Sequence, residues 1–143
     1  MPTTFRYVVA DVFTDTALAG NQLAVFTDAR DIPEEVLQPL AKEMNLSETV
    51  YVYPSEEADA KIRIFTPGTE LQFAGHPTLG SAFILGGPMQ LEEIRLETGA
   101  GTVPVRLERE GARISFGWMT QPVPRWEPYE RADELLSVLG VES

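Results

Sequence analysis

The carboxyl group best placed for chemistry is that of Glu48, in the segment Ser47-Glu48-Thr49. This segment lies between a helical pattern that ends near Asn45 and an apolar alternation that begins at Val50. A carboxylate at such a boundary, between two hydroxyl groups and beside core residues, can take up and return a proton as a general acid and base. The alternative is that Ser47 or Thr49 only ends the helix and that Glu48 is a solvated surface residue.

The single histidine, His76, stands in the segment 73–77, just before a strongly apolar stretch. If a helix begins there, its first N–H groups and the positive end of its dipole favour an anion such as a carboxylate. Gly75 would let a ligand approach the backbone closely, and Pro77 suits the first helical turn. The alternative is an ordinary histidine at a helix start. One histidine, no cysteine and no carboxylate four residues further on argue against a metal site.

A third polar cluster is the dipeptide Gly20-Asn21. Glycine permits unusual backbone angles, and the asparagine side chain can donate and accept hydrogen bonds at once. The alternative is a plain turn. The sequence contains no phosphate-binding loop, no dinucleotide fingerprint and no nucleophile elbow, so these motifs give no reason to expect nucleotide or serine-hydrolase chemistry.

Alternating β-branched and aromatic residues predict the strands that would position these clusters. The predicted strands cover residues 4–13, 22–27, 49–54, 61–66, 94–97, 102–108 and 113–119. The pair 49–54 and 61–66 is expected to form a hairpin across an acidic loop, and Glu110-Gly111 to form the tight turn between the last two strands.

Two helices are predicted between these strands. The first follows Asp31 as a candidate N-cap and Pro33 as an initiating residue, and Pro39 is expected to bend it or to delay its start. The second covers residues 77–85, is apolar on all sides and is therefore expected to be buried, with an end at residues 86–88. Strands around one buried helix, with a second helix outside, make an α+β domain.

The end of the chain has a different character. Residues 121–128 are rich in proline and are expected to be extended, and residues 130–139 form a short amphipathic helix ended by Gly140. This pattern fits the crossing into a second domain. A C-terminal helix that docks back on the first domain fits it equally well.

Composition limits the classes of partner. The chain of 143 residues has a formal net charge of −11 and no cysteine. Such acidity disfavours binding to nucleic acid or to anionic membranes, and most of the acidic residues are expected to be solvated. Without a signal-peptide pattern or an apolar run of about 20 residues, a cytoplasmic protein is expected.

Five motifs in order resemble the PhzF-like family of phenazine biosynthesis. They are Phe13-Thr14-Asp15, Gly20-Asn21-Gln22-Leu23-Ala24-Val25, Leu46-Ser47-Glu48-Thr49-Val50, Arg63-Ile64-Phe65-Thr66-Pro67, and the run from Glu70 to Gly80 that contains Gly75-His76-Pro77. Each motif alone is weak, but five in the same order and spacing are specific. The likeness covers residues 5–120.

The resemblance implies a fold like that of diaminopimelate epimerase, in which a curved, mostly antiparallel sheet wraps around a buried central helix. Family members have two such domains with the active site between them. By similarity, Glu48 is the catalytic residue that transfers the proton, Gly75 and His76 bind the substrate, and Asn21 lines the same cleft. The implied activity is that of a cofactor-independent isomerase or epimerase, without a metal, acting on a small carboxylate-bearing substrate that is dihydroaromatic or amino-acid-like.

The chain departs from the family pattern in two ways. Gln22 and Gln72 stand where the family usually has proline, and the chain is about half the usual length. Residues 1–120 are thus expected to be the N-terminal domain, and residues 121–143 a linker and the start of a missing second domain. A homodimer or a complementary second domain is the expected partner. The alternative function is a non-catalytic small-molecule-binding or assembly module that kept the fold.

Overall fold

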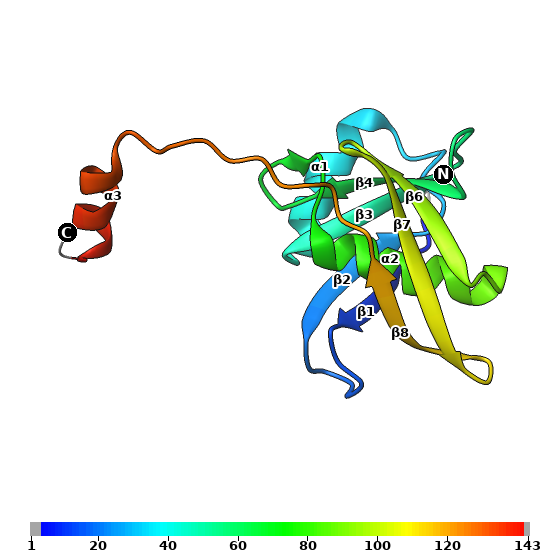
Figure 1. Cartoon of the computed structure of the whole chain (residues 1–143). Coiled ribbons are helices and arrows are strands. Elements are labelled where there is room, and N and C mark those ends of the chain that lie inside the picture. Colours follow the sequence, from blue (N-terminus) through cyan, green and yellow to red (C-terminus); the bar gives the residue numbers. More distant parts are fainter. Residues whose placement is uncertain (1–3, 142–143) are drawn as a thin grey trace.

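A computed structural model describes residues 4–141, which form a curled sheet, two helices packed on it and a third helix at the end of an extended tail (Figure 1). The strands are β1 (Val8–Val12), β2 (Asn21–Phe26), β3 (Glu48–Tyr53), β4 (Ala60–Phe65), β5 (Glu70–Leu71), β6 (Glu93–Thr98), β7 (Gly101–Glu110) and β8 (Arg113–Met119). The helices are α1 (Glu34–Met44), α2 (Gly75–Met89) and α3 (Ala132–Leu139). The predicted domain ranges 1–120 and 121–143 include residues 1–3 and 142–143, which lie outside the described residues.

The strand order is β1-β2-β3-β4-β6-β7-β8, with the short β5 added to β4. The β2–β3 and β4–β6 pairs are parallel, and the other pairs are antiparallel. Each parallel pair is bridged by a helix, α1 in the first case and α2 in the second, because parallel strands need a crossover connection. The sheet is therefore mostly antiparallel, as predicted, and β3–β4 is the predicted hairpin.

Helix α2 lies inside the curl of the sheet and packs against the inward-facing side chains of its strands (Figure 1). None of residues 77–85 is exposed, as predicted, but the large apolar residues of this segment are only half-buried (Leu79, Phe83, Ile84 and Leu85). The approach is close at Gly80, where an added Cβ would lie 2.6 Å from Leu23 Cδ2 and 2.8 Å from Val12 Cγ2. Only a residue without a side chain fits between β1, β2 and the helix at this point.

The predicted end of this helix at residues 86–88 was wrong, because α2 continues to Met89 and ends at Gln90 in the left-handed conformation. Gly86 is instead a packing residue: an added Cβ would lie 2.3 Å from Leu107 Cδ1. Its carbonyl oxygen also accepts a hydrogen bond from Arg109 Nη2 at 2.9 Å. These contacts with Leu107 and Arg109 stabilise the last turn of α2, although glycine and proline disfavour helix there.

Helix α1 covers the opposite face of β2, β3 and β4 and forms a second apolar cluster there. The Tyr51 hydroxyl donates a hydrogen bond of 2.7 Å to the Leu37 carbonyl oxygen and so ties this helix to β3. The helix begins at Glu34, and the predicted cap at Asp31 was wrong because Pro33 is the N-cap. A delayed start was wrong too. Pro39 lies on the exposed side, where the carbonyl that lost its partner can bind water.

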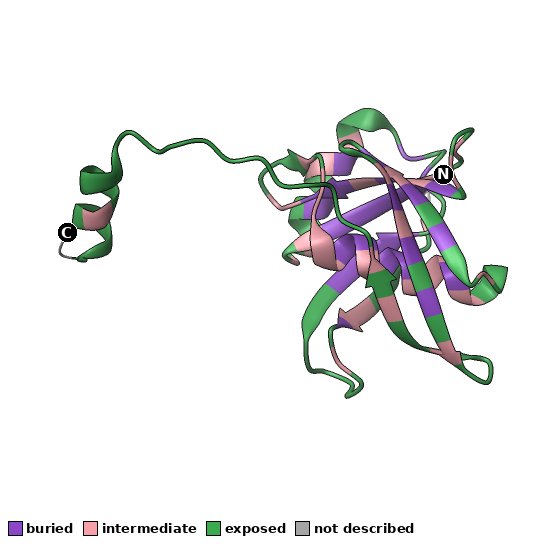
Figure 2. Cartoon of the chain, in the orientation of Figure 1, coloured by how far each residue is buried: buried purple, intermediate pink, exposed green. Residues whose placement is uncertain are grey.

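The tail leaves the sheet as an extended segment, and α3 lies apart from the rest of the chain (Figures 1 and 2). Every residue from 120 to 135 is exposed, and α3 contains no buried residue. Gly140 ends it in the left-handed conformation, as predicted. The helix does not dock back on the sheet in the described chain.

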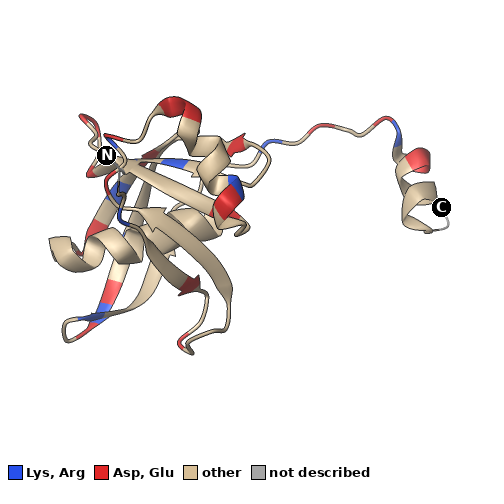
Figure 3. Ribbon diagram, turned by 180° about the vertical axis from the view of Figure 1, so that it is seen from behind, with Lys and Arg blue, Asp and Glu red and all other residues tan. Residues whose placement is uncertain are grey.

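Charged residues are distributed over many elements along the chain (Figure 3). Within residues 4–141, no helix combines the length and the apolar character that crossing a membrane requires.

Candidate active site

The structure brings together two of the residues singled out in the sequence, Glu48 and His76. Glu48 Oε2 lies 3.3 Å from His76 Nε2, although the two residues are far apart in the chain. Only 16% of the Glu48 side chain and 10% of the His76 side chain are exposed. A carboxylate and an imidazole therefore meet at a site that is largely withdrawn from water.

Glu48 is positioned by the junction between α1 and β3. Asn45 ends the helix in the left-handed conformation, with φ of 52°, and its N–H bonds to the Ala41 carbonyl. The chain then turns into the centre of the sheet, where Glu48 pairs with Leu23 of the parallel strand β2. Because side chains alternate along a strand, Glu48 points to the same face as Leu23 and Val50, which is the face that α2 packs against.

His76 is positioned by the start of α2. Ala74 is the N-cap, and the Thr78 hydroxyl donates a hydrogen bond of 2.7 Å back to its carbonyl oxygen. One turn further on, Gly80 rests against Leu23, the residue that pairs with Glu48. Strand β2 thus fixes both partners: it aligns the strand that carries Glu48 and it supports the helix that carries His76.

The polar atoms of this pair are not satisfied by the surrounding protein. Glu48 Oε2 and His76 Nε2 are both buried and have no hydrogen-bond partner of good geometry. Buried polar groups are nearly always hydrogen-bonded, so an exception of this kind marks a strained, catalytic or ligand-binding position. The Thr49 and Ser81 hydroxyls are buried without a partner as well, but Thr49 points to the opposite face of the sheet from Glu48. The pair therefore has hydrogen-bonding capacity that residues 4–141 leave unused.

Gly75 is the first residue of α2 and is half-buried. The N–H groups of Gly75 and His76 lie in the first turn, where a helix provides no internal acceptor, and Pro77 has no N–H. These donors and the positive end of the helix dipole can hold a carboxylate. A Cβ added at Gly75 would lie 3.7 Å from Met119 Cε, an ordinary contact, so the fold itself does not require glycine here.

Asn21 begins β2 and lies on the same face as Leu23, two residues further along. Its side chain is exposed and lines a surface hollow together with Ser47. The residues that line this hollow include neither Glu48 nor His76, so the structure places Asn21 outside the buried pair. Gly20 precedes it with φ of +78°, and an added Cβ would lie 2.3 Å from the Val12 carbonyl oxygen, so the turn into this strand needs glycine.

Sequence reasoning did not select one aromatic residue beside this pair. The ring centroid of Phe13 lies 6.4 Å from that of His76. Phe13 belongs to one of the five motifs, but no propensity or spacing rule marks its side chain as part of a site.

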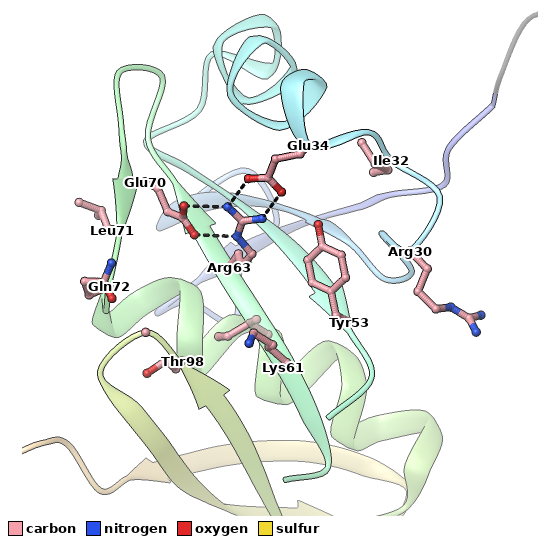
Figure 4. A pocket seen from close by; sticks show the side chains of 12 residues that line it. Arg30, Ile32, Glu34, Tyr53, Lys61, Arg63, Glu70, Leu71, Gln72 and Thr98 are labelled. Atoms are coloured by element: carbon pink, nitrogen blue, oxygen red, sulfur yellow. Dashed lines mark hydrogen bonds and ion pairs between the residues drawn. The ribbon is translucent and has the colours of Figure 1, made fainter. Parts of the chain in front are cut away.

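A second charged cluster on the opposite face was also not predicted (Figure 4). Arg63 Nε and Nη2 donate to Glu70 at 2.7 and 2.8 Å, and its Nη1 and Nη2 donate to Glu34 at 2.6 and 2.8 Å. These bonds raise the pKa of Arg63 and lower that of Glu34. Glu34 is thus an ion-pair partner, whereas most acidic residues were expected to be only solvated. Among residues 4–141, no three His, Asp or Glu side chains gather as a potential metal ligand set.

The chain is similar to known proteins over almost its whole length. A family model described as phenazine biosynthesis-like protein matches residues 10–142. Trans-2,3-dihydro-3-hydroxyanthranilate isomerase of Pseudomonas aeruginosa is 49% identical over 138 residues, which make up 96% of this chain and 50% of that protein. The chain thus spans about half the length of the curated relatives it matches.

Solved structures share the fold. A Bacillus anthracis phenazine biosynthesis protein of the PhzF family gives a TM-score of 0.79 at 30% identity and covers 99% of this chain and 48% of its own. A predicted epimerase from Pseudomonas aeruginosa gives a TM-score of 0.69 at 34% identity, over 76% of this chain and 40% of its own. The predicted epimerase-like α+β fold is confirmed.

Proposed function

The chain belongs to the phenazine biosynthesis-like protein family, and from this membership we propose that it forms half of the active site of a cofactor-independent isomerase. The observation that carries the proposal is the Glu48–His76 pair, which is buried and 3.3 Å apart and has no hydrogen-bond partner among residues 4–141. Such a pair is suited to proton transfer with a bound substrate, because a positioned carboxylate can act first as base and then as acid.

In this proposal Glu48 removes a proton from a carbon that a neighbouring carboxylate or unsaturated system has made acidic, and it returns the proton at another carbon. His76 and the first amides of α2 hold and orient the substrate carboxylate. Glu48 is thereby regenerated in the form in which it began. Neither step draws on a cofactor or a metal.

The substrate class follows from the site and from the relatives. A helix start that can accept a carboxylate favours small acids, and curated relatives are named trans-2,3-dihydro-3-hydroxyanthranilate isomerase. We therefore propose a small carboxylate-bearing substrate that is dihydroaromatic or amino-acid-like. A cytoplasmic location is a separate part of the proposal and rests on the sequence pattern alone.

A complete cleft needs a second half, which a further domain or a second chain would provide. The chain covers half of its relatives' length, and its tail presents apolar side chains to water. These include Trp126, Leu135 and Leu139, which are exposed and available for contact with such a partner. Nucleic acid and membranes are not among the proposed partners, because a formal net charge of −11 disfavours binding to polyanions.

The test is hydrogen–deuterium exchange at substrate carbon, measured by NMR in an assembly with both halves of the cleft. Exchange that accompanies isomerisation of a dihydroaromatic amino acid supports the proposal. If the complete assembly binds such acids without any exchange, the alternative of a non-catalytic binding or assembly module is the correct one.

A further inference from the structure

Phe13 is a large apolar residue that is exposed although it lies next to a core residue in the chain. Its side chain is 68% exposed, although it directly follows Val12, a core residue of β1. Its backbone has φ of +64°, a left-handed conformation that a bulky aromatic residue rarely adopts. Residues held in such conformations cluster at functional sites. The chain therefore maintains an unfavourable backbone angle that turns an aromatic ring outward.

The loop that carries Phe13 is built to keep this arrangement. The Asp11 carboxylate accepts a hydrogen bond of 2.8 Å from the Leu18 N–H, and Thr14 Oγ1 accepts one of 3.0 Å from the Thr16 N–H. The loop returns to the sheet at Asn21, which pairs with Val12. Side-chain to backbone bonds of this kind fix loop shape, so the position of the ring follows from an ordered loop.

The orientation of the ring relative to the site is the second observation. The Phe13 and His76 ring planes are inclined at 57°, with centroids 6.4 Å apart. His76 Nε2 in turn lies 3.3 Å from Glu48 Oε2. His76 thus lies between the Glu48 carboxylate and the Phe13 ring, and the three residues come from separate parts of the chain. Of the three, only Phe13 is exposed.

We propose that Phe13 is a positioning residue that forms one wall of the substrate site and packs against the face of a planar, unsaturated ring. This inference rests on the proposed function for the location of the site. Phenylalanine has no proton to exchange, so its contribution is to hold the ring next to Glu48 and His76. Offset and edge-to-face packing of aromatic rings favours unsaturated over saturated partners of the same size.

A matched pair of probes tests this role directly. Anthranilate (2-aminobenzoate) carries an amino and a carboxylate group on a planar ring, and 2-aminocyclohexanecarboxylate carries them on a saturated ring. The saturated acid has a protonated amine at neutral pH and anthranilate does not, so the effect of each mutation is compared with the unmutated affinity for the same acid. Their affinities are measured by calorimetry for the complete assembly, unmutated and with Phe13→Leu, Phe13→Tyr or Phe116→Leu. Leucine keeps an apolar side chain but loses the aromatic face, and tyrosine restores that face.

We expect Phe13→Leu to weaken anthranilate about tenfold, as the loss of one aromatic contact implies, and to change the saturated acid much less. Phe13→Tyr should bind anthranilate like the unmutated protein. Phe116→Leu should do so as well, because Phe116 packs against Trp118 on the outer surface of β8. Circular dichroism of each variant verifies that it is folded.

Other results would overturn the inference. Equal weakening of both acids by Phe13→Leu would show a general structural role, and no weakening, or no anthranilate binding even before mutation, would show that the ring does not meet the ligand. The proposed function fails separately, when the unmutated assembly exchanges no substrate proton. An assembly that exchanges protons with an unchanged KM after Phe13→Leu keeps the function and loses the inference.

Discussion

Two charged clusters lie on opposite faces of the same sheet, and they differ in whether their polar atoms are satisfied. Arg63 on β4 faces α1 and binds Glu34 and Glu70 with four hydrogen bonds (Figure 4). Glu48 on the neighbouring strand β3 faces α2, and its contact with His76 leaves both buried atoms without hydrogen-bond partners. The strands are the same, but the first cluster is complete within the chain and the second is not.

We interpret this difference as one between a structural ion-pair cluster and the proposed active site. Arg63 presents a planar fork of donors that matches two carboxylates, so its charge is neutralised by groups of the fold. Glu48 and His76 are more buried than Glu34 and Glu70, so an unmade hydrogen bond has a larger energetic consequence there. In the proposed function a substrate completes this pair. The predictions that follow test this assignment from the largest effect to the smallest.

The largest effect is expected from Glu48→Gln. Glutamine keeps the shape and can hydrogen-bond, but it cannot take up and return a proton. We expect the rate of proton exchange in the complete assembly to fall by about 10²–10⁴-fold, or further if Glu48 is the sole proton carrier. Substrate affinity and the far-UV circular dichroism spectrum should be preserved.

Glu34→Gln is the matched control, since it makes the same chemical change in the satisfied cluster. It should leave the exchange rate within about twofold, because Glu34 lies on the opposite face of the sheet and its carboxylate is bound there by Arg63. Normal exchange by Glu48→Gln, or equal losses in both variants, would remove the distinction between the clusters.

His76→Ala is expected to have the next largest effect, on binding. A hydrogen bond to a charged group contributes about 1.5–3 kcal/mol, so loss of the imidazole should raise KM by roughly 10–100-fold. Binding of simple anions such as acetate should weaken without being lost, because the amides of Gly75 and residue 76 remain at the helix start. Calorimetry at low salt measures this, and unchanged acetate affinity would show that His76 does not face the anion.

Arg63→Leu should reverse this pattern, with an effect on stability and none on catalysis. It leaves Glu34 and Glu70 as like charges without their shared partner, and we expect Tm to fall by about 3–5 °C. The rate of proton exchange should stay normal at temperatures where the variant is folded. A variant with unchanged Tm and impaired exchange would mean that the Arg63 cluster belongs to the functional machinery.

Some features of the structure could be predicted from local sequence patterns, and others could not. The buried helix, the hairpin and the C-terminal ends of α1 and α3 follow from local patterns and from residues such as Asn45 and Gly140. The pairing of Glu48 with His76 could be anticipated only through the family motifs, because it joins two elements that no local rule brings together. The extension of α2 past Gly86 depends on Leu107 and Arg109, and no pattern within the helix itself contains that information.

The smallest expected effect is a change in how stability depends on pH. Hydrogen bonding to Arg63 lowers the pKa of Glu34 below its ordinary value of 4.5 in the folded chain. Between the lowered pKa and pH 4.5, the unfolded chain therefore binds more protons than the folded chain. The contribution of Glu34 to the free energy of unfolding is fully present above pH 4.5 and is lost as pH falls through the lowered pKa. The pKa of Glu97 is lowered too, first by the Ser55 hydroxyl and then by Lys61.

Urea unfolding at pH values from 3 to 6 gives the free energy of unfolding of the unmutated chain and of Arg63→Leu. The part of the pH dependence that is due to Glu97 is common to both proteins and serves as an internal reference. The unmutated chain should lose stability as the pH falls below 4.5. Arg63→Leu should lose less over the same interval, because Glu34 then titrates near its ordinary pKa in both states, while the portion due to Glu97 remains. If the free energy of unfolding depended on pH in the same way in both proteins, Arg63 would not bind Glu34 in solution. The Arg63 cluster could then no longer be contrasted with the Glu48–His76 pair as a cluster whose polar atoms are satisfied.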